Sequence, residues 1–500
     1  MKKLLCLFLA VLMLVSLAAC GTGEGKDPLD TKGDNSQVSE QETVDMDFVC
    51  ELPDDLNYNN ETVNIIYAKA TGREDELVSE GLGYGVVSDA VYERNELVQD
   101  QLKVVFNLIA EDSSVDNKVS KDIQAGGGEY DLVVNGTYMA ITPAMTGKYL
   151  DLSGLEYLDP SKHYWTQGYN DMVTFTENKH QYLVSGPVAL SMFRLMYTTI
   201  YNKTLFEANQ ETDLYEVVMN GKWTLDYQYS VLKDRYVDSD GDGKVSKNDS
   251  YGFVTGNIVS TDPYPVAADI HLIIKDADTY DLAFNGDAVA PISDLIEKVQ
   301  LIYNDQSTYV FKTATEDDVG KNNIVETFAL GKSMMATLIF WNMEHNFSDL
   351  ASMSYGIAPI PKYSEEQPAY HSYVQDQVSS FGISAGVGDE NRQEMLGAVL
   401  ESLAYHSYRI VRPAYYETSL SSKYMQDPQS AEILDLIFDS LSFDFSSSCS
   451  NVITGCVIRD NLRPLLSGSK STGVSSTIAR WEKSVSNALK KYNNSLNALG

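Results

Sequence analysis

The chain has 500 residues, of which 43% are hydrophobic and 10% aromatic. This composition excludes a disordered chain, and the length predicts roughly two to four domains. The 71 Asp and Glu residues outnumber the 37 Lys and Arg residues, which gives a formal charge of −34. A surface this acidic repels phosphates, so nucleic acid is excluded as a partner and neutral or cationic ligands are favoured.

The first twenty residues carry an export signal. Lys2 and Lys3 precede an unbroken apolar run over 4–15, and small residues follow it. The run is shorter than the about 20 apolar residues of a membrane span, so residues 1–19 are predicted to be a cleaved signal peptide. Residues 17–20 (LAAC) resemble the lipobox of bacterial lipoproteins. That resemblance implies that Cys20 becomes the N-terminus and carries diacylglycerol and palmitate; the alternative is ordinary cleavage with Cys20 incidental.

Residues 20–60 are predicted to form the lipidated N-terminus and a flexible acidic tether. Gly, Ser, Thr, Asn and acidic residues dominate this stretch, which therefore buries too little apolar surface to offset chain entropy. Loss of Lys2 and Lys3 with the signal changes the charge to 35 minus 71, or −36. Acyl chains would hold the protein at the extracytoplasmic face of the bacterial cell membrane, and this lipid anchor would be its only membrane contact.

Short apolar runs and helical spacings alternate from residue 62 onward. Strands are predicted at 62–67, 104–109 and 131–134. A helix is predicted between the first two strands, with Val87, Val91, Val98 and Leu102 on one face, and another before the third strand, ending at 126–128. This alternation predicts an α/β layer with a largely parallel sheet. Ligands of such sheets lie beyond the carboxyl ends of the strands, here near 68–73 and 135–141.

Further helices are predicted along the second half of the chain, at 223–236, 288–303 and 390–406. A last, long amphipathic helix is predicted from apolar residues spaced by threes and fours between Val474 and Leu496. Cys449 and Cys456 either form a short disulfide loop or stay reduced, and the sequence leaves both open. Cys50 has no evident partner.

Four segments, in order along the chain, resemble the extracellular solute-binding proteins of sugar-type ABC transporters, a maltose-binding-like family. They are 201–207 (YNKTLFE), 221–226 (GKWTLD), 328–335 (FALGKSMM) and 355–362 (YGIAPIPK). The resemblance implies an α/β, type II periplasmic-binding-protein fold with two α/β lobes joined by hinge strands. The N-lobe would comprise 61–186 plus 378–412, and the C-lobe 187–377 plus 413–500. The chain would cross between lobes near Gly186, near 377–380 and near Arg412.

By the same resemblance, the protein is expected to be a monomer that binds a mono- or oligosaccharide in the cleft and delivers it to the permease subunits of an ABC importer. No catalytic motif stands against this expectation. There is no G-x-S-x-G and no H-E-x-x-H, and the six His residues are scattered. The expectation is therefore a binding protein and not an enzyme. Two alternatives stay open: a secreted polysaccharide-degrading enzyme, and a surface adhesion or sensory module with the same fold.

Residues 238–249 match the spacing of a calcium-binding loop, D-x-D-x-D-G with an acid at the twelfth position. Calcium takes six to eight oxygen ligands, and Gly243 permits the sharp turn that brings them to one point. The predicted ligands of a structural Ca²⁺ are Asp238, Asp240, Asp242, the Lys244 carbonyl, Ser246 and Asp249. Asp at the twelfth position resembles dockerin loops more than the EF-hand form. The alternative is a solvated acidic turn without metal.

A sugar site needs flat aromatic faces beside planar polar groups. Trp341 follows the 328–335 segment, where maltose-type binders place a stacking Trp, and it is predicted to be the main platform; the rival interpretation is core packing beside Phe340. Further predicted ligand contacts are Tyr138, Tyr264, Arg73, Asn135, Asp262 and Asn342. For the two tyrosines the alternative is simple packing, and for each of the four polar residues it is a solvated loop position.

Overall fold

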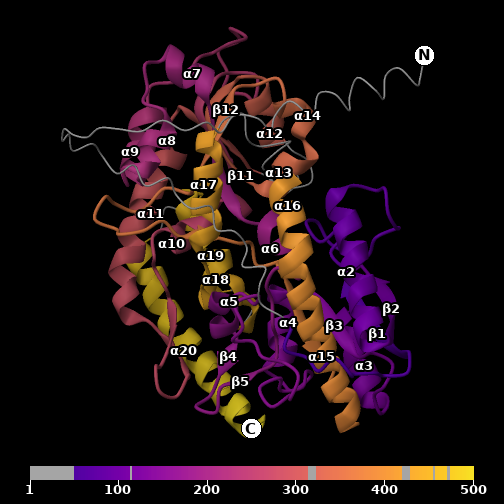
Figure 1. The fold of residues 1–500 in the computed structure, drawn as a ribbon. Helices are drawn as coiled ribbons and strands as arrows, with labels where there is room; N and C mark the ends of the chain where they lie inside the picture. The colour runs from indigo at the N-terminus through magenta and orange to yellow at the C-terminus, as the bar shows by residue number, and fades with distance from the viewer. Residues whose placement is uncertain are drawn as a thin grey trace, which may run out of the picture. The chain divides into compact units, whose positions relative to one another are not determined.

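Two β-sheets, built by different parts of the chain, organise the fold in the computed structural model (Figure 1). The structure describes residues 50–112, 115–312, 323–418, 428–453, 457–469 and 473–499. The first sheet has the strand order β14-β3-β1-β2 and the second the order β10-β7-β11-β6-β12. We call the first sheet and the helices that pack on it the first lobe. The second sheet and its helices are the second lobe.

The strands and helices follow one another along the whole chain. The strands are β1 (Glu61–Ala68), β2 (Val104–Glu111), β3 (Leu132–Gly136), β4 (Thr174–Phe175), β5 (His180–Gln181), β6 (Tyr197–Asn202), β7 (Tyr251–Gly256), β8 (Ile273–Lys275), β9 (Leu282–Phe284), β10 (Thr308–Phe311), β11 (Ser333–Ile339), β12 (Tyr355–Ala358), β13 (Ser372–Tyr373), β14 (Ser379–Ile383) and β15 (Leu441–Ser442). The helices are α2 (Val86–Leu102), α3 (Val115–Ala125), α4 (Thr137–Ala144), α5 (Gln167–Met172), α6 (Ser191–Arg194), α7 (Lys203–Ala208), α8 (Leu214–Met219), α9 (Leu225–Leu232), α10 (Pro263–Ala267), α11 (Val289–Tyr303), α12 (Asn323–Ala329), α13 (Phe340–His345), α14 (Phe347–Leu350), α15 (Glu390–His406), α16 (Arg412–Thr418), α17 (Pro428–Asp439), α18 (Phe445–Ser448), α19 (Val457–Leu466) and α20 (Val474–Leu499).

The first lobe confirms the predicted parallel layer. Ile65 of β1 lies opposite Leu108 of β2 and Leu132 of β3, and both pairings are parallel. β14 joins β3 antiparallel, with Phe381 opposite Val134, 247 residues earlier in the chain. Because helices cover such sheets, their central strands are apolar on both faces, and Val63, Ile65 and Ile66 are at most 1% exposed. The carboxyl ends of β1 and β3 therefore share one edge.

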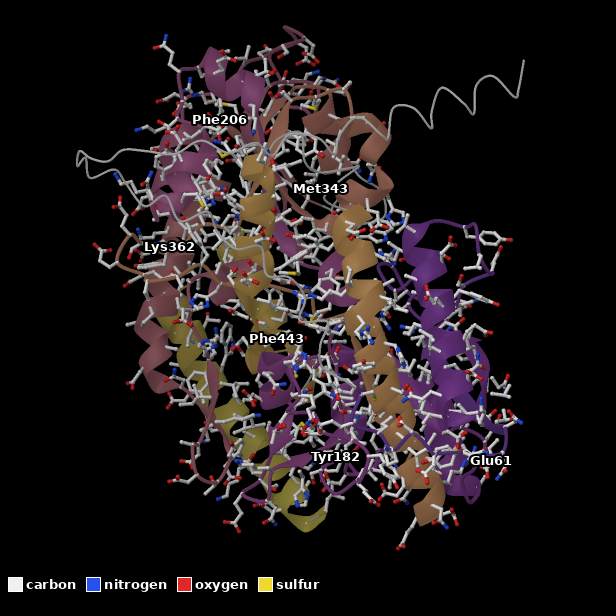
Figure 2. The ribbon with its side chains drawn as sticks, viewed as in Figure 1. Glu61, Tyr182, Phe206, Met343, Lys362 and Phe443 are labelled. Carbon is white, nitrogen blue, oxygen red and sulfur yellow. The ribbon has the colours of Figure 1, made fainter. Side chains whose placement is uncertain are left out.

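The second lobe contains a mixed sheet. β7 pairs parallel with β10 and β11, whereas β6 pairs antiparallel with β11 and β12. α11 packs against α9, α19 and α20 on this lobe. Figure 2 labels three buried side chains: Tyr182, next to β14, and Phe206 and Met343 of the second lobe. None of them is more than 4% exposed. Each lobe thus has its own apolar core.

The chain passes between the two sheets three times. The first passage (residues 184–196) leads to β6, and the second (374–381) leads back into β14. These two run side by side, because Val184 and Phe381 exchange backbone hydrogen bonds of 2.9 Å. The third passage follows α15, which packs on α2, and begins with the π-helical turn Ser407–Val411 that continues into α16. Figure 1 shows α15 and α16 as one nearly continuous orange column.

These passages lie where crossings were predicted, although the lobe boundaries themselves remain predictions. One helix prediction was too long: α9 covers Leu225–Leu232 and not 223–236. The Thr224 hydroxyl caps its start by accepting from the Tyr227 N–H, and the backbone leaves the helix at Lys233, before Asp234 takes a φ of 60°. No helix in the described part of the chain combines the length and the hydropathy needed to cross a bilayer.

Candidate functional site

Arg73 and Asn135, predicted from two separate loops, meet at the carboxyl edge of the first sheet. Arg73 lies in the loop after β1 and donates from Nη1 to Oδ1 of Asn135 at 3.4 Å. Its Nη2 donates to Oε1 of Gln377, in the second passage, at 3.0 Å. Gly136 leaves room for this contact, because a Cβ there would lie 2.8 Å from Nη2 of Arg73. The guanidinium therefore joins the first lobe to a hinge segment.

The half-buried carboxyl of Asp116 holds the Asn135 side chain in place. Asn135 donates from Nδ2 to Oδ2 of Asp116 at 3.2 Å, and the Tyr149 hydroxyl donates to the other oxygen at 3.2 Å. Burial raises the pKa of Asp116 to about 6, against the opposing effect of these two hydrogen bonds. Asp116, together with Arg73 and the Gly136 N–H, therefore sets the orientation of the Asn135 amide.

Tyr138 and Arg459 connect the two lobes. The ring of Tyr138, at the start of α4, lies 4.4 Å from the guanidinium carbon of Arg459 on α19, which is a cation–π contact. Nη1 of Arg459 also donates to Oδ2 of Asp376 in the second passage, and the Tyr138 N–H donates to the Asp376 carbonyl at 2.9 Å. Burial raises the pKa of the Asp376 carboxyl, while Arg459 opposes that rise.

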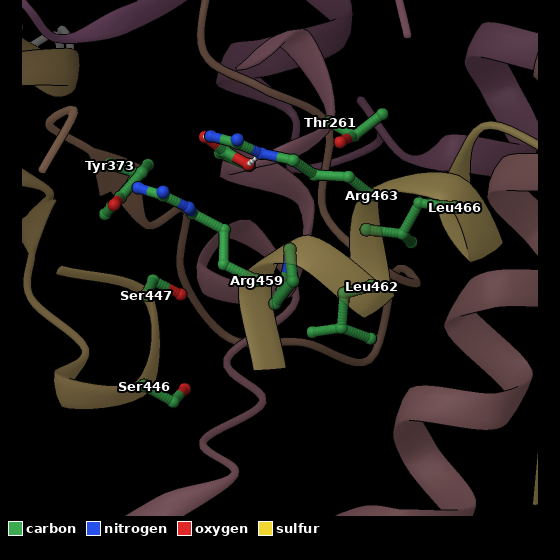
Figure 3. Close-up of a pocket in the computed structure, with 10 residues that line it drawn as sticks. Thr261, Tyr373, Ser446, Ser447, Arg459, Leu462, Arg463 and Leu466 are labelled. Atoms are coloured by element: carbon green, nitrogen blue, oxygen red, sulfur yellow. Dashed lines mark hydrogen bonds and ion pairs between the residues drawn. The ribbon is translucent and has the colours of Figure 1, made fainter. Parts of the chain in front are cut away.

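Asp262 forms the second acid–guanidinium pair of this region. Arg463, one helical turn after Arg459, donates from Nε and Nη2 to its two oxygens at 2.7 and 2.5 Å, the bidentate geometry that arginine favours. Figure 3 shows both arginines extending from α19, with Tyr373 near Arg459. Tyr373 is buried and stacks on Tyr197, with ring centroids 5.9 Å apart and planes 5° apart.

A small cavity lies among these side chains. It is lined by Thr261, Asp262, Pro265, Tyr373, Ser446, Ser447, Arg459, Leu462, Arg463 and Leu466, and its volume is about 20 Å³. That volume holds about one water molecule and is far below the several hundred Å³ of a small-molecule site. A sugar therefore enters this cavity only if the surrounding elements move apart.

Trp341 lies at another contact between the lobes. Its indole Nε1, on α13, donates to Oε2 of Glu74 in the loop after β1 at 3.2 Å, and its ring stacks on His345 with centroids 4.0 Å apart. Arg194 contacts both lobes at the same point: its guanidinium pairs with Glu344 at 3.0 Å and donates to the Glu74 carbonyl. Trp341 is 7% exposed. The ring is largely covered, yet it borders the loop that carries Arg73.

Two predicted contacts have structural partners. Tyr264 is 1% exposed, and its ring meets that of Tyr303 edge-on at 6.1 Å. Asn342 accepts from the Ile339 N–H at 3.1 Å and so caps the start of α13. These placements agree with the packing alternative for Tyr264 and explain why Asn342 is needed locally; a ligand role for either remains a prediction.

Sequence reasoning missed several residues of the site, above all Arg459, Arg463, Asp376, Gln377 and Glu74. Two arginines at i and i+4 are a detectable signal in a chain with only 37 basic residues, because they share one helix face. Their acids could not be found this way, since Asp262 lies 201 residues from Arg463. Gln377 did fall within the predicted return crossing.

The predicted calcium loop brings three of its acids together. Oxygen atoms of Asp238, Asp240 and Asp242 lie within 4.8 Å of one another, and Gly243 has a φ of 72°, the left-handed turn expected of it. Asp249 is fully buried and accepts from the backbone N–H groups of Ser239 and Ser246 at 3.2 and 2.9 Å. The three clustered carboxylates fit a hard divalent cation. Asp249 instead forms hydrogen bonds across the loop, to Ser239 and Ser246.

Other predictions fall outside the described residues. These are the signal peptide, Cys20 and the tether up to residue 49, together with Cys456. Cys449 is buried and Cys50 is half-buried, and the pairing of Cys449 with Cys456 stays open.

No protein-family model matches the sequence, and the search of curated proteins found no match. Solved structures do match in fold. UspC of M. tuberculosis is 14% identical, with a TM-score of 0.54 over 85% of this chain and 100% of that chain. The cyclic alpha-maltosyl-1,6-maltose binding protein of Arthrobacter globiformis is 14% identical, with a TM-score of 0.54 over 86% of this chain and 100% of that one. The GacH receptor of Streptomyces glaucescens, solved unliganded and with acarbose, is 14% identical, with a TM-score of 0.50 over 88% and 99%. With its two sheets and three passages, the chain therefore has the type II periplasmic-binding-protein fold of the maltose-binding-like proteins.

Proposed function

We propose that this protein is a solute-binding protein of an ABC importer, which captures a carbohydrate between its lobes and releases it unaltered to a permease. The observation that carries the proposal is the meeting of Arg73, Asn135 and Tyr138 around the second passage, where the lobes join. Planar amides, guanidinium groups and aromatic faces are the groups that bind sugar hydroxyls and C–H faces.

The fold supports a mechanism of lobe closure. A guest that contacts both lobes binds the closed state better, and this difference in affinity shifts the hinge equilibrium. Two solved proteins of the same fold bind acarbose and cyclic alpha-maltosyl-1,6-maltose, which supports an oligosaccharide as the guest here. Closure would also create the surface that the permease recognises.

The decisive test is a thermal-shift screen of the mature protein in detergent against mono- and oligosaccharides, amino acids and peptides, followed by calorimetry and mass spectrometry of any hit. We expect one carbohydrate to raise the melting temperature, to bind one to one and to be recovered intact. A cleaved sugar would indicate a polysaccharide-degrading enzyme. Binding only to insoluble polymer would indicate an adhesion module.

We further propose that the protein is a monomer anchored outside the membrane through acylated Cys20, and that residues 238–249 bind a structural Ca²⁺. The lipobox resemblance supports the first proposal, and the three converging acids support the second. Mass spectrometry of the mature N-terminus tests the anchor: we expect the mass of a diacylglyceryl-modified Cys20, and an unmodified thiol there would exclude it. Melting curves with added Ca²⁺ and with chelator test the metal.

A further inference from the structure

A fully buried carboxylate lies at the junction of the lobes, outside the candidate sugar contacts. Glu76, in the loop after β1, is 2% exposed. Its Oε1 accepts from the Ser191 N–H at 2.6 Å and from the Ser191 hydroxyl, and its Oε2 accepts from the Ser379 hydroxyl at 2.6 Å. A buried charge is costly unless it is paired or hydrogen-bonded. Among the described residues Glu76 forms no ion pair within 4.0 Å, so these three hydrogen bonds are its direct partners, with the charges of Arg73 and Arg94 acting from further away.

The partners of Glu76 belong to two different passages. Ser191 lies in the first passage, and Ser379 lies in the second. The two serines are also bonded to each other, because the Ser379 N–H donates to Oγ of Ser191 at 3.0 Å. Both are fully buried. One carboxylate of the first lobe therefore ties together the two segments that must bend when the lobes move.

The third passage is tied to the same place. Arg94 of α2 is fully buried and donates from Nη2 to the Glu76 carbonyl at 2.8 Å. Its Nη1 donates to Oγ of Ser407 at 3.2 Å, and Ser407 opens the π-helical turn between α15 and α16. Single π-helical turns within helices occur frequently at functional positions. All three passages thus meet at Glu76 and Arg94.

The loop that carries Glu76 also carries two residues of the candidate site. Arg73 reaches Gln377 and Asn135, and Glu74 accepts from Trp341 of the second lobe. A shift of the Ser191 or Ser379 backbone would move Glu76, and with it residues two and three positions earlier in the same short loop. The Glu76 side chain therefore links the position of the hinge segments to the placement of the candidate site residues.

We infer that Glu76 is a positioning residue for lobe closure: by binding Ser191 and Ser379 it couples the bend of the passages to the placement of Arg73 and Glu74. This inference rests on the proposed function only in taking closure as the working motion. Burial raises the pKa of Glu76, with the serine hydrogen bonds opposing that rise, which agrees with a carboxyl that depends on those bonds.

The test uses the ligand-free mature protein, so it needs no knowledge of the guest. Ser379→Ala removes the donor to Oε2 of Glu76, and Ser191→Ala removes the hydroxyl shared with both partners. Ser402→Ala is the matched control, because Ser402 is equally buried and donates to Gln101 at 2.7 Å, away from the passages. Hydrogen exchange is followed at 69–77, 186–196 and 374–381, and the radius of gyration by solution scattering.

We expect each of the first two variants to speed amide exchange about tenfold in all three segments together, since a hydrogen bond to a buried carboxylate is among the stronger ones. We also expect a larger radius of gyration, while Ser402→Ala changes neither. Faster exchange confined to the mutated passage, or an unchanged radius of gyration, would overturn the inference. If no carbohydrate binds the wild-type protein, the proposed function fails, but the exchange and scattering results still decide the role of Glu76.

Discussion

Trp341 combines burial with a contact between the lobes. It is 7% exposed and stacked on His345, but its indole N–H reaches across to Glu74 of the first lobe. A side chain that only packs within the second lobe would form no hydrogen bond to the first lobe. The geometry therefore makes Trp341 sensitive to lobe position even where its ring face is covered.

We expect Trp341→Ala to weaken carbohydrate binding about tenfold to a hundredfold, as truncation of a central aromatic often does, with Trp341→Phe intermediate because it keeps a ring and loses the bond to Glu74. Calorimetry measures both. Trp223→Phe is the control: Trp223 is fully buried and donates to the Pro359 carbonyl at 2.7 Å inside the second lobe, so it should leave affinity unchanged. Unaltered binding in both Trp341 variants would assign that residue to the core.

Gly136 is a second position where a single atom decides the site geometry. A Cβ there would lie 2.8 Å from Nη2 of Arg73 and 3.0 Å from Oε1 of Gln377, so Gly136→Ala must push these groups apart. We expect about tenfold weaker carbohydrate binding with a nearly unchanged melting temperature. Gly286→Ala, where the added atom meets nothing within 4 Å, is the control, and equal affinities of the two variants would contradict this account.

Asp116 makes the stability of the folded protein depend on pH. Its folded pKa of about 6 lies above the ordinary value of 3.8, so the folded state holds the proton more tightly. Its contribution to stability therefore falls as pH rises through the window from 3.8 to about 6. In Asp116→Asn this loss is absent. We expect the melting temperature of the variant, relative to wild type, to be higher at pH 7 than at pH 4 by a few degrees; a difference that does not change with pH would refute the assignment.

At the scale of elements, regular periodicity in the sequence predicted the helices and strands well. Contacts between residues far apart in the sequence could not be predicted. The helix at 390–406 was predicted to the residue; it is buried on all sides over Met395–Tyr405, and Asp389 caps its start by accepting from the Arg392 N–H. The end of α9 was missed, because the backbone turn at Lys233 has no strong sequence signal. The bridge from Tyr138 to Arg459 joins residues more than 300 positions apart, and no local pattern contains that information. The first-lobe half of the site could thus be predicted, whereas its α19 half could not.

The proposed metal binding of the loop 238–249 can be tested separately from the rest of the protein. Three carboxylates within 4.8 Å of one another repel unless a cation lies between them. We expect added Ca²⁺ to raise the melting temperature, and chelator to lower it, because a metal bound only to the folded state stabilises that state. Asp240→Asn combined with Asp242→Asn should abolish the response. Asp276→Asn, in an exposed turn closed by Thr279 and Asp278, should retain it; identical melts with and without chelator would exclude a stabilising metal.

At the scale of the whole molecule, the interactions near α19 divide into two kinds. Arg463 and Asp262 both belong to the second lobe, so their pair is indifferent to lobe movement. Arg459 instead reaches Tyr138 of the first lobe and Asp376 of the second passage. Separation of the lobes would therefore break the contact of Arg459 with Tyr138 and leave the pair of Arg463 with Asp262 in place.

This difference allows a test on one helix. We expect Arg459→Ala to increase the radius of gyration of the ligand-free protein, because it removes a cation–π contact and a buried ion pair that hold the lobes together. Arg463→Ala removes an ion pair of similar burial one turn away and should leave the radius unchanged, although it lowers the melting temperature. Solution scattering on both variants, with the wild type as reference, measures the effect. Equal radii in all three proteins would mean that Arg459 does not control opening, and that the contacts of α4 with residues 450–452 hold the lobes together instead.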